Sequence, residues 1–333
     1  MQLYITEKPS VAADIAKALN LKFQRKEGYF DAGETVITWC YGHLLKSREP
    51  EGYNESYKHW KASDLPLKLH PIQLEPIADK KAHTKQVISL IKQADVIIHA
   101  GDPDDEGQLL VDELLLFAKS KKPVKRLLIN DNTDAAIKKA LTNLQDNSKF
   151  DGIFQKTLAR TTGDLIYGLS MTRAYTLAGK SQGYSGVLSV GRVQTPILGL
   201  IVRRFLANQA HTASFFYTLT GVFNVNDKTF NANWQISNDA PKDEKNRLIS
   251  KNFAEELAAK LKGKAAVVNS IKIENKNTTP PLPFNLVKLQ QHMNQRFKLT
   301  AARTLEITQT LREKHKAITY NRSDFCYLSQ EQY

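Results

Sequence analysis

A short acidic turn has the clearest capacity for chemistry in this sequence. It reads Gly-Asp-Pro-Asp-Asp-Glu-Gly and places Asp102, Asp104 and Glu106 between a strand-like apolar stretch and a helix-like one. Glu7 follows another apolar strand-like stretch near the start of the chain. Functional groups of an open parallel sheet gather beyond the carboxyl ends of its strands. We therefore expect these four carboxylates to converge.

The converging carboxylates predict a cation site. Four like charges within a few ångströms repel one another strongly, and a divalent cation relieves that repulsion. Carboxylate oxygens with room for water suit Mg²⁺. The alternative is a solvated acidic turn with no ligand, and Glu7 at the end of a second strand favours the metal.

Tyr320 lies in the segment Ile-Thr-Tyr-Asn-Arg-Ser-Asp, and it is the resemblance of this segment to a family motif, given below, that implies a nucleophile. A phenol has a pKa of about 10, so its attack on a phosphodiester at neutral pH needs assistance. The planar guanidinium of Arg322 suits the oxygens of a phosphate. Any one of the 12 tyrosines is by itself more often a packing residue, so the assignment depends on the surrounding motif.

Strand-like and helix-like stretches alternate over the first 150 residues. Alternation of this kind indicates an α/β domain with a largely parallel sheet. The expected strands lie at 3–6, 36–41, 95–100 and 125–129, and the expected helices at 11–19, 108–118 and 134–141.

The rest of the chain changes character twice. Residues 151–212 are expected to be mostly helical, and 213–278 to be rich in β-structure, with strands at 215–220, 229–234 and 265–273. Helical periodicity returns in the last segment, 279–333. The sequence thus predicts a multidomain protein with α/β, α and β parts, divided at 1–150, 151–212, 213–278 and 279–333.

The charge balance indicates a polyanionic partner. The formal net charge is +13, spread along the chain, which favours a charged groove over a disordered tail. Solubility alone is the simpler explanation of that charge. No apolar run is long enough to span a membrane, the N-terminus lacks the features of a signal peptide, and no nucleotide-binding P-loop pattern occurs. We expect a cytoplasmic protein that binds neither membrane nor nucleotide cofactor.

The strand ending in Glu7 and the later Asp-x-Asp-x-Glu turn resemble the Toprim domain, which topoisomerases, bacterial primases and some nucleases share. Glu7-Lys8-Pro9-Ser10 matches the EKPS opening of the topoisomerase III group, and the acidic turn matches its GDPDREGQ. Asp105 departs from this pattern, because the family usually has arginine there. The change replaces a cation facing the DNA with an anion.

Further segments resemble type IA DNA topoisomerases in the same order along the chain. Leu188 to Pro196 is similar to LSxGRVQTP, residues 164–174 to a helical DNA-contacting segment, and Pro281 to Gln290 to the start of the nucleophile domain. The Tyr320 segment is similar to ITYPRSD, with Asn321 in place of proline and Arg312 in place of a tyrosine in the preceding helix. The resemblance covers the N-terminal half of the family's length, from the Rossmann-like Toprim domain through the helical and β segments of the ring.

The resemblance implies an ATP-independent topoisomerase of the bacterial cytoplasm or nucleoid. Tyr320 would cut one strand of single-stranded or negatively supercoiled DNA and form a 5′-phosphotyrosine, with strand passage and rejoining to follow. Lys8 would supply charge or a proton to the leaving 3′ hydroxyl, with Glu7 as its acid–base partner. The DNA-contacting residues implied are Arg160, Asp164, Arg173, Ser189, Arg192 and Gln194.

Two alternatives remain at this point. A Toprim primase or nuclease explains Glu7 and the acidic turn but gives Tyr320 no role. A non-catalytic single-stranded-DNA-binding remnant of a topoisomerase explains the three departures at Asp105, Arg312 and Asn321. Formation of a covalent protein–DNA adduct would distinguish both from an active topoisomerase.

Overall fold

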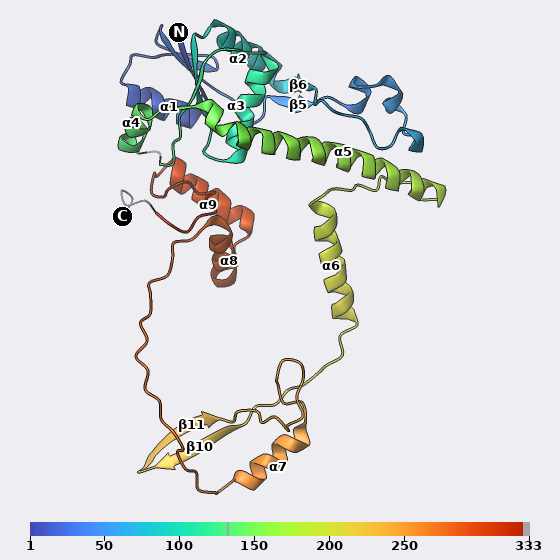
Figure 1. Ribbon diagram of the computed structural model, residues 1–333, viewed down its shortest axis with the longest axis vertical. Coiled ribbons are helices and arrows are strands. Elements are labelled where there is room, and N and C mark those ends of the chain that lie inside the picture. Colours follow the sequence, from blue (N-terminus) through green and yellow to red (C-terminus); the bar gives the residue numbers. More distant parts are fainter. Residues whose placement is uncertain (132, 329–333) are drawn as a thin grey trace. The chain divides into compact units, whose positions relative to one another are not determined.

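A seven-stranded sheet forms the centre of the N-terminal part of the chain (Figure 1). The computed structural model describes residues 1–131 and 133–328. The strand order is β2-β3-β4-β1-β7-β8-β9, and the four strands from β4 to β8 pair in parallel, whereas β2, β3 and β9 pair antiparallel at the two edges. The strands span Gln2–Thr6 (β1), Gln24–Lys26 (β2), Tyr29–Asp31 (β3), Thr35–Trp39 (β4), Val96–Ala100 (β7), Val124–Arg126 (β8) and Gln145–Asp146 (β9).

The two faces of this sheet are covered by different helices because neighbouring strand residues point to opposite sides. Leu3 and Ile5 pack with apolar residues of α2 (Lys81–Gln93) and α3 (Asp105–Phe117). Tyr4 packs on the other face with residues of α1 (Pro9–Leu19) and α4 (Asp134–Thr142). The predicted α/β domain with a largely parallel sheet is confirmed.

Helix α5 (Asp151–Ser181) is 31 residues long and leaves the α/β domain after packing against α3. Its middle part packs through Leu165, Ile166 and Leu169 on a small cluster around Leu67 and Leu69. That cluster lies in an irregular segment between β4 and α2. The segment contains β5 (Leu45–Ser47), β6 (Leu74–Pro76) and four 3-10 helices, η1 (Pro50–Gly52), η2 (Glu55–Lys58), η3 (Ala62–Asp64) and η4 (Ala78–Lys80), with η5 (Asn147–Phe150) preceding α5.

Two helices near the end of the described chain carry the Tyr320 segment. They are α8 (Leu286–Phe297) and α9 (Ala301–Glu313), and they pack on each other. Asn285 and Thr300 cap their N-termini by accepting hydrogen bonds from Lys288 N and Arg303 N. Both helices belong to the same unit as the sheet, a unit formed by residues 1–196 together with the chain from residue 281 onward.

Residues 197–280 form a second unit. It contains the antiparallel hairpin β10 (Thr220–Val225) and β11 (Lys228–Asn233), and the helix α7 (Lys251–Leu261). A small core of Ala240, Leu248 and Ala254 lies beside them. Helix α6 (Gln194–Gln209) spans the boundary between the two units in the sequence.

The β-rich segment differs from the sequence prediction in three places. The strand predicted at 215–220 is reduced to one bridge between Tyr217 and Leu248, and only Thr220 lies in β10. Residues 265–273 form no strand, although their apolar alternation predicted one. Helix α7 was not predicted. A strand needs a partner for its backbone hydrogen bonds, which local alternation does not supply. The division into four domains stays a prediction.

Candidate active site

The parallel pairing of β1 and β7 brings two acidic segments to one edge of the sheet. Thr6 is paired with Ala100, so Glu7 and the turn that begins at Gly101 leave the sheet side by side. Glu7 and Asp102 are both buried. The predicted placement of Glu7 beside the acidic turn is therefore confirmed.

Close backbone packing fixes the conformation of the acidic turn. A Cβ atom on Gly101 would lie 2.2 Å from the carbonyl oxygen of Gly107, and one on Gly107 would lie 2.3 Å from that of Asp102. Asp104 caps helix α3 by accepting a hydrogen bond of 2.7 Å from Gly107 N. Only glycine fits at both contact points, so a side chain at either position would disrupt the turn.

Arg126 of β8 stabilises the acidic turn through hydrogen bonds to its backbone. Its buried guanidinium donates hydrogen bonds to the carbonyl oxygens of Gly101 and Asp102, both at 2.8 Å, and to Gln108 Oε1 at 2.9 Å. Burial lowers the pKa of Arg126 to about 10, which leaves it charged at neutral pH. The turn is thus held by a cation that satisfies its inward-facing carbonyls.

Burial and the neighbouring carboxylates raise the proton affinity of Glu7. Burial, and then the charges of Asp102 and Asp104, raise the pKa of Glu7 to about 7. Lys8 lies among these acids, with its Nζ 3.3 Å from Asp102 Oδ2, 3.9 Å from Glu7 Oε1 and 3.2 Å from Glu313 Oε1. Glu7 and Lys8 therefore form the predicted acid–base pair in space, and their catalytic role stays a prediction.

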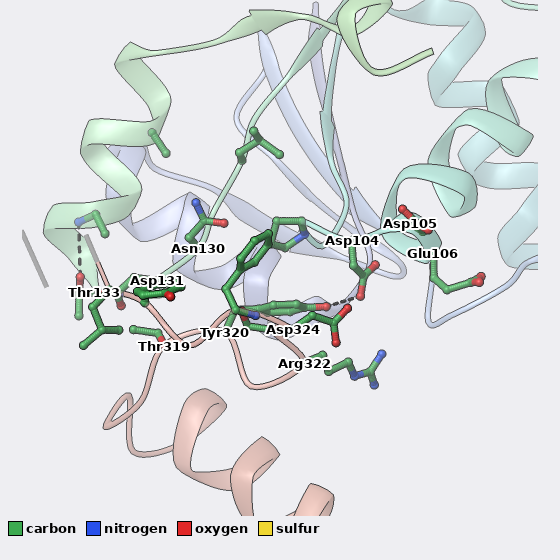
Figure 2. A pocket seen from close by; sticks show the side chains of 18 of the residues that line it. Asp104, Asp105, Glu106, Asn130, Asp131, Thr133, Thr319, Tyr320, Arg322 and Asp324 are labelled. Atoms are coloured by element: carbon green, nitrogen blue, oxygen red, sulfur yellow. Dashed lines mark hydrogen bonds between the residues drawn. The ribbon is translucent and has the colours of Figure 1, made fainter. Parts of the chain in front are cut away.

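Tyr320 reaches this acidic site from a segment more than 200 residues away in sequence. Its hydroxyl donates a hydrogen bond to Asp104 Oδ2, which Figure 2 shows. Burial, and then the hydrogen bond to Asp104, raise the pKa of the phenol above its usual value. Asp104 is thus the nearest proton acceptor, and the hydroxyl is protonated in this arrangement.

A cavity of about 1330 Å³ opens beside the Tyr320 hydroxyl. Arg322 is exposed and lines this cavity. Its charge lowers the pKa of both Tyr320 and Glu7, which offsets part of the rise that burial and the aspartates cause. The acidic turn and the segment before α4 also line the cavity, through Asp104, Asp105, Glu106, Asn130 and Asp131 (Figure 2). Helix α5 contributes Lys156 and Arg160. The cavity therefore joins the candidate nucleophile, the acids and several cations.

The structure does not bring all four predicted metal ligands together. Glu106 is half exposed and pairs with Arg160 of α5, with His43 Nε2 at 3.7 Å. Glu106 lies in the first turn of α3, and its ion pair with Arg160 joins it to α5. Within residues 1–131 and 133–328, no group of three or more His, Cys, Asp or Glu side chains has a metal-holding arrangement. The predicted four-carboxylate cluster is thus corrected.

The remaining three acids still have the chemistry that Mg²⁺ prefers. Glu7, Asp102 and Asp104 offer hard oxygen atoms, and repulsion from the two aspartates adds to burial in raising the pKa of Glu7. Lys8 and Arg312 form ion pairs with Asp102, while Asp104 accepts a hydrogen bond from the Tyr320 hydroxyl. The chemistry of these donors suits the ion, but their arrangement in the described residues is not one that holds a metal, and binding would require Asp102 to exchange a protein cation for it.

Most of the predicted DNA-contacting residues lie along α5 and the loop that docks on it. Arg192 forms a bidentate ion pair with Asp164, in which Nε donates to Oδ1 and Nη2 donates to Oδ2 at 2.9 Å. Gln194 Nε2 donates to Ser189 Oγ at 3.1 Å. These side chains are exposed or partly exposed, which leaves their DNA contact as a prediction.

Arg173 has a different environment from the other predicted DNA-contacting residues. It is buried, donates to the carbonyl oxygen of Tyr57 at 2.7 Å and lies 5.2 Å from the ring centroid of Trp60. In this structure Arg173 fastens α5 to the irregular segment, because it lies about two and a half turns beyond Asp164 and so faces the opposite side of the helix. Its contact with DNA stays a prediction, which would require this buried side chain to become accessible.

All three departures from the family pattern have partners. Asp105 pairs with Lys156 at 2.7 Å, Arg312 with Asp102 at 3.5 Å, and Asn321 donates to Gln309 Oε1 at 3.1 Å. Sequence reasoning identified them as departures and missed these contacts. Their spacing gave no signal, since none of the three pairs lies on one element.

Comparisons with known proteins identify the family of this chain. The family model described as Toprim domain matches residues 2–132, and the one described as DNA topoisomerase matches residues 148–333. The chain is 41% identical over 341 residues to DNA topoisomerase 3 of Salmonella typhimurium, covering 100% of this chain and 52% of that protein. It is 33% identical to DNA topoisomerase 3 of Bacillus subtilis, covering 98% and 43%.

A solved structure shares the fold. Full-length topoisomerase I from Thermotoga maritima superposes with a TM-score of 0.67 at 21% identity, covering 99% of this chain and 50% of that one. A Toprim domain followed by the topoisomerase region defines the class. The chain belongs to the DNA topoisomerase family, with the type IA fold, and it spans about half the length of the curated relatives it matches. Among the residues described, no helix is long and apolar enough to cross a membrane.

Proposed function

We propose that this chain carries the strand-cutting site of a type IA DNA topoisomerase, with Tyr320 as the nucleophile. The observation that supports this most directly is the hydrogen bond from the Tyr320 hydroxyl to Asp104 of the acidic turn. A Toprim primase or nuclease would need the acids but not this tyrosine. The substrate is single-stranded or negatively supercoiled DNA, in the bacterial cytoplasm or nucleoid.

The proposed cleavage exchanges one phosphate ester for another. The phenolic oxygen of Tyr320 attacks phosphorus, its proton passes to Asp104, and the bond from phosphorus to the 3′ oxygen breaks. The leaving oxygen takes a proton from Lys8, which forms ion pairs with Glu7 and Asp102. Arg322, exposed at the cavity, neutralises the scissile phosphate.

The product retains the energy of the broken bond as a 5′-phosphotyrosine. Attack by the 3′ hydroxyl on that ester rejoins the strand, so strand passage, relaxation and decatenation need no ATP. Mg²⁺ would be held by Glu7, Asp102 and Asp104, and when bound it supplies positive charge for rejoining. The paired cations Arg160 and Arg192, with Asp164, Ser189 and Gln194, would contact the bound strand.

A covalent-trapping experiment tests this proposal. End-labelled single-stranded DNA should give an SDS-stable adduct with the wild-type chain, linked through the 5′ phosphate. Tyr320→Phe should abolish the adduct but change DNA affinity only a few-fold, because only one hydroxyl is lost. The matched control is Tyr327→Phe, which alters an exposed tyrosine lining the same cavity.

Two outcomes would contradict the assignment. An adduct that persists in Tyr320→Phe would identify another nucleophile, and a 3′ linkage would indicate a different class of topoisomerase. A wild-type chain that binds DNA in a salt-dependent manner without any adduct would support the non-catalytic alternative.

A further inference from the structure

Arg312 places a permanent positive charge inside the acidic site. Its side chain is buried at 2% exposure, and its Nη1 lies 3.5 Å from Asp102 Oδ2, where both partners are almost inaccessible to water. The Nε of Arg312 is buried and has no hydrogen-bond partner in the described part of the chain. A buried charge of this kind is retained only where an opposite charge compensates it, and here Asp102 does so.

The same guanidinium also contacts the candidate nucleophile. Its central carbon lies 4.5 Å from the centroid of the Tyr320 ring, within the range of a cation–π interaction. Arg312 is in the last turn of α9, and Tyr320 follows in the loop beyond it. One side chain therefore connects the acidic turn to the position of the phenol.

Asp102 already has two protein cations. Lys8 Nζ lies 3.3 Å from the oxygen that Arg312 contacts. Together these cations offset the charge that a divalent ion would use, and a guanidinium repels a second cation at close range. The family pattern has an uncharged tyrosine at position 312, so the second cation is a feature of this chain.

We propose that Arg312 is an internal counter-ion, which competes with a divalent cation for Asp102 and holds the face of the Tyr320 ring. This inference rests on the proposed function, since it concerns the Mg²⁺ site of the same centre. It follows that the chain binds Mg²⁺ weakly, and that removing the guanidinium charge tightens binding. A unit charge within a few ångströms of a divalent ion, partly screened by solvent, corresponds to roughly a tenfold change in affinity.

Magnesium binding by the chain without DNA tests the proposal. Isothermal titration calorimetry would compare the wild type with Arg312→Gln, Arg312→Tyr and Arg312→Lys. Both neutral variants should bind Mg²⁺ about tenfold more tightly. The lysine variant keeps the charge and should stay within threefold of the wild type, as should the control Arg303→Gln, which alters an exposed arginine of the same helix.

Each result decides the question. Folded neutral variants with wild-type Mg²⁺ affinity would overturn the proposal. An Arg312→Lys variant that gains as much Mg²⁺ affinity as Arg312→Gln would also overturn it. Neutral variants that fail to fold would also overturn it, because Arg312 would then be a structural ion pair and not a replaceable counter-ion. Asp102→Asn should weaken binding in every background.

The test is independent of strand cleavage. Tighter Mg²⁺ binding by Arg312→Gln without any covalent adduct in the wild type would support the counter-ion and reject the proposed cleavage. The reverse result, an adduct through Tyr320 with Mg²⁺ affinity unaffected by Arg312, would reject the counter-ion alone.

Discussion

Replacing Asp105 with arginine should tighten the binding of single-stranded DNA and make it more sensitive to salt. Asp105 pairs with Lys156 at 2.7 Å, and Arg160 Nη1 lies 4.0 Å from the same carboxylate oxygen. Both cations line the cavity beside Tyr320. Arginine at position 105 adds a cation, and it also releases Lys156, which is 62% exposed, for contact with phosphate.

The magnitude follows from the number of phosphates contacted. Each contact on a single strand adds about 0.7 to the slope of log K against log salt. One added cation and one released cation therefore steepen the slope by roughly 0.7 to 1.4. At about 0.1 M salt this corresponds to an affinity gain of about fivefold for each contact.

Fluorescence anisotropy with a labelled single-stranded oligonucleotide, titrated at several KCl concentrations, measures both quantities. Asp105→Asn releases Lys156 without adding a cation. The slope of log K against log salt should therefore steepen by about half as much as in Asp105→Arg. Glu27→Arg is the matched control, because it makes the same change in net charge on an exposed turn between β2 and β3. Equal slopes for Asp105→Arg and Glu27→Arg would refute the reasoning, since the effect would then be one of net charge.

Two further predictions concern the support of the acidic turn. Arg126→Met should lower the free energy of unfolding by about 3–5 kcal/mol, because buried carbonyl oxygens lose their donor. Urea denaturation measures this change. The control is Lys125→Met, which removes an exposed ion pair with Asp146 and should lower the free energy of unfolding by under about 1 kcal/mol. Burial holds the pKa of His99 well below its usual value, so the unfolded chain binds a proton that the folded chain does not, and stability should fall by up to about 1.4 kcal/mol per pH unit below about pH 6.5. Denaturation of the wild type and His99→Gln between pH 7 and 5 checks this, and equal pH dependence in both would exclude His99 as its source.

The second unit shows where local patterns were insufficient. Alternating apolar residues at 265–273 predicted a strand, yet Ile271 and Ile273 are exposed and unpaired in the described structure. The hairpin of β10 and β11 forms because Asn226 and Asp227 adopt the positive φ angles, 47° and 60°, of a tight two-residue turn. A turn is encoded locally by its own residues, whereas a strand depends on a partner elsewhere.

The sequence alone determined the α/β domain and the position of Glu7 beside the acidic turn. Apolar runs of strand length alternate with helical periodicity, and both the Glu7 and Asp102 segments begin where such a run ends. These features are local, and parallel pairing of consecutive strand–helix units then fixes which ends meet. The motif around Tyr320 likewise indicates a nucleophile from the sequence alone.

Only the tertiary structure decided which charges meet at the site. In the tertiary structure Glu106 pairs with Arg160, and the buried Arg173 donates a hydrogen bond to Tyr57. Arg312 contacts both Asp102 and the Tyr320 ring. Each of these partners comes from a separate element, so no spacing along the chain encodes the pair. Electrostatic interactions depend on distance and burial, and both are set by how the helices pack on the sheet.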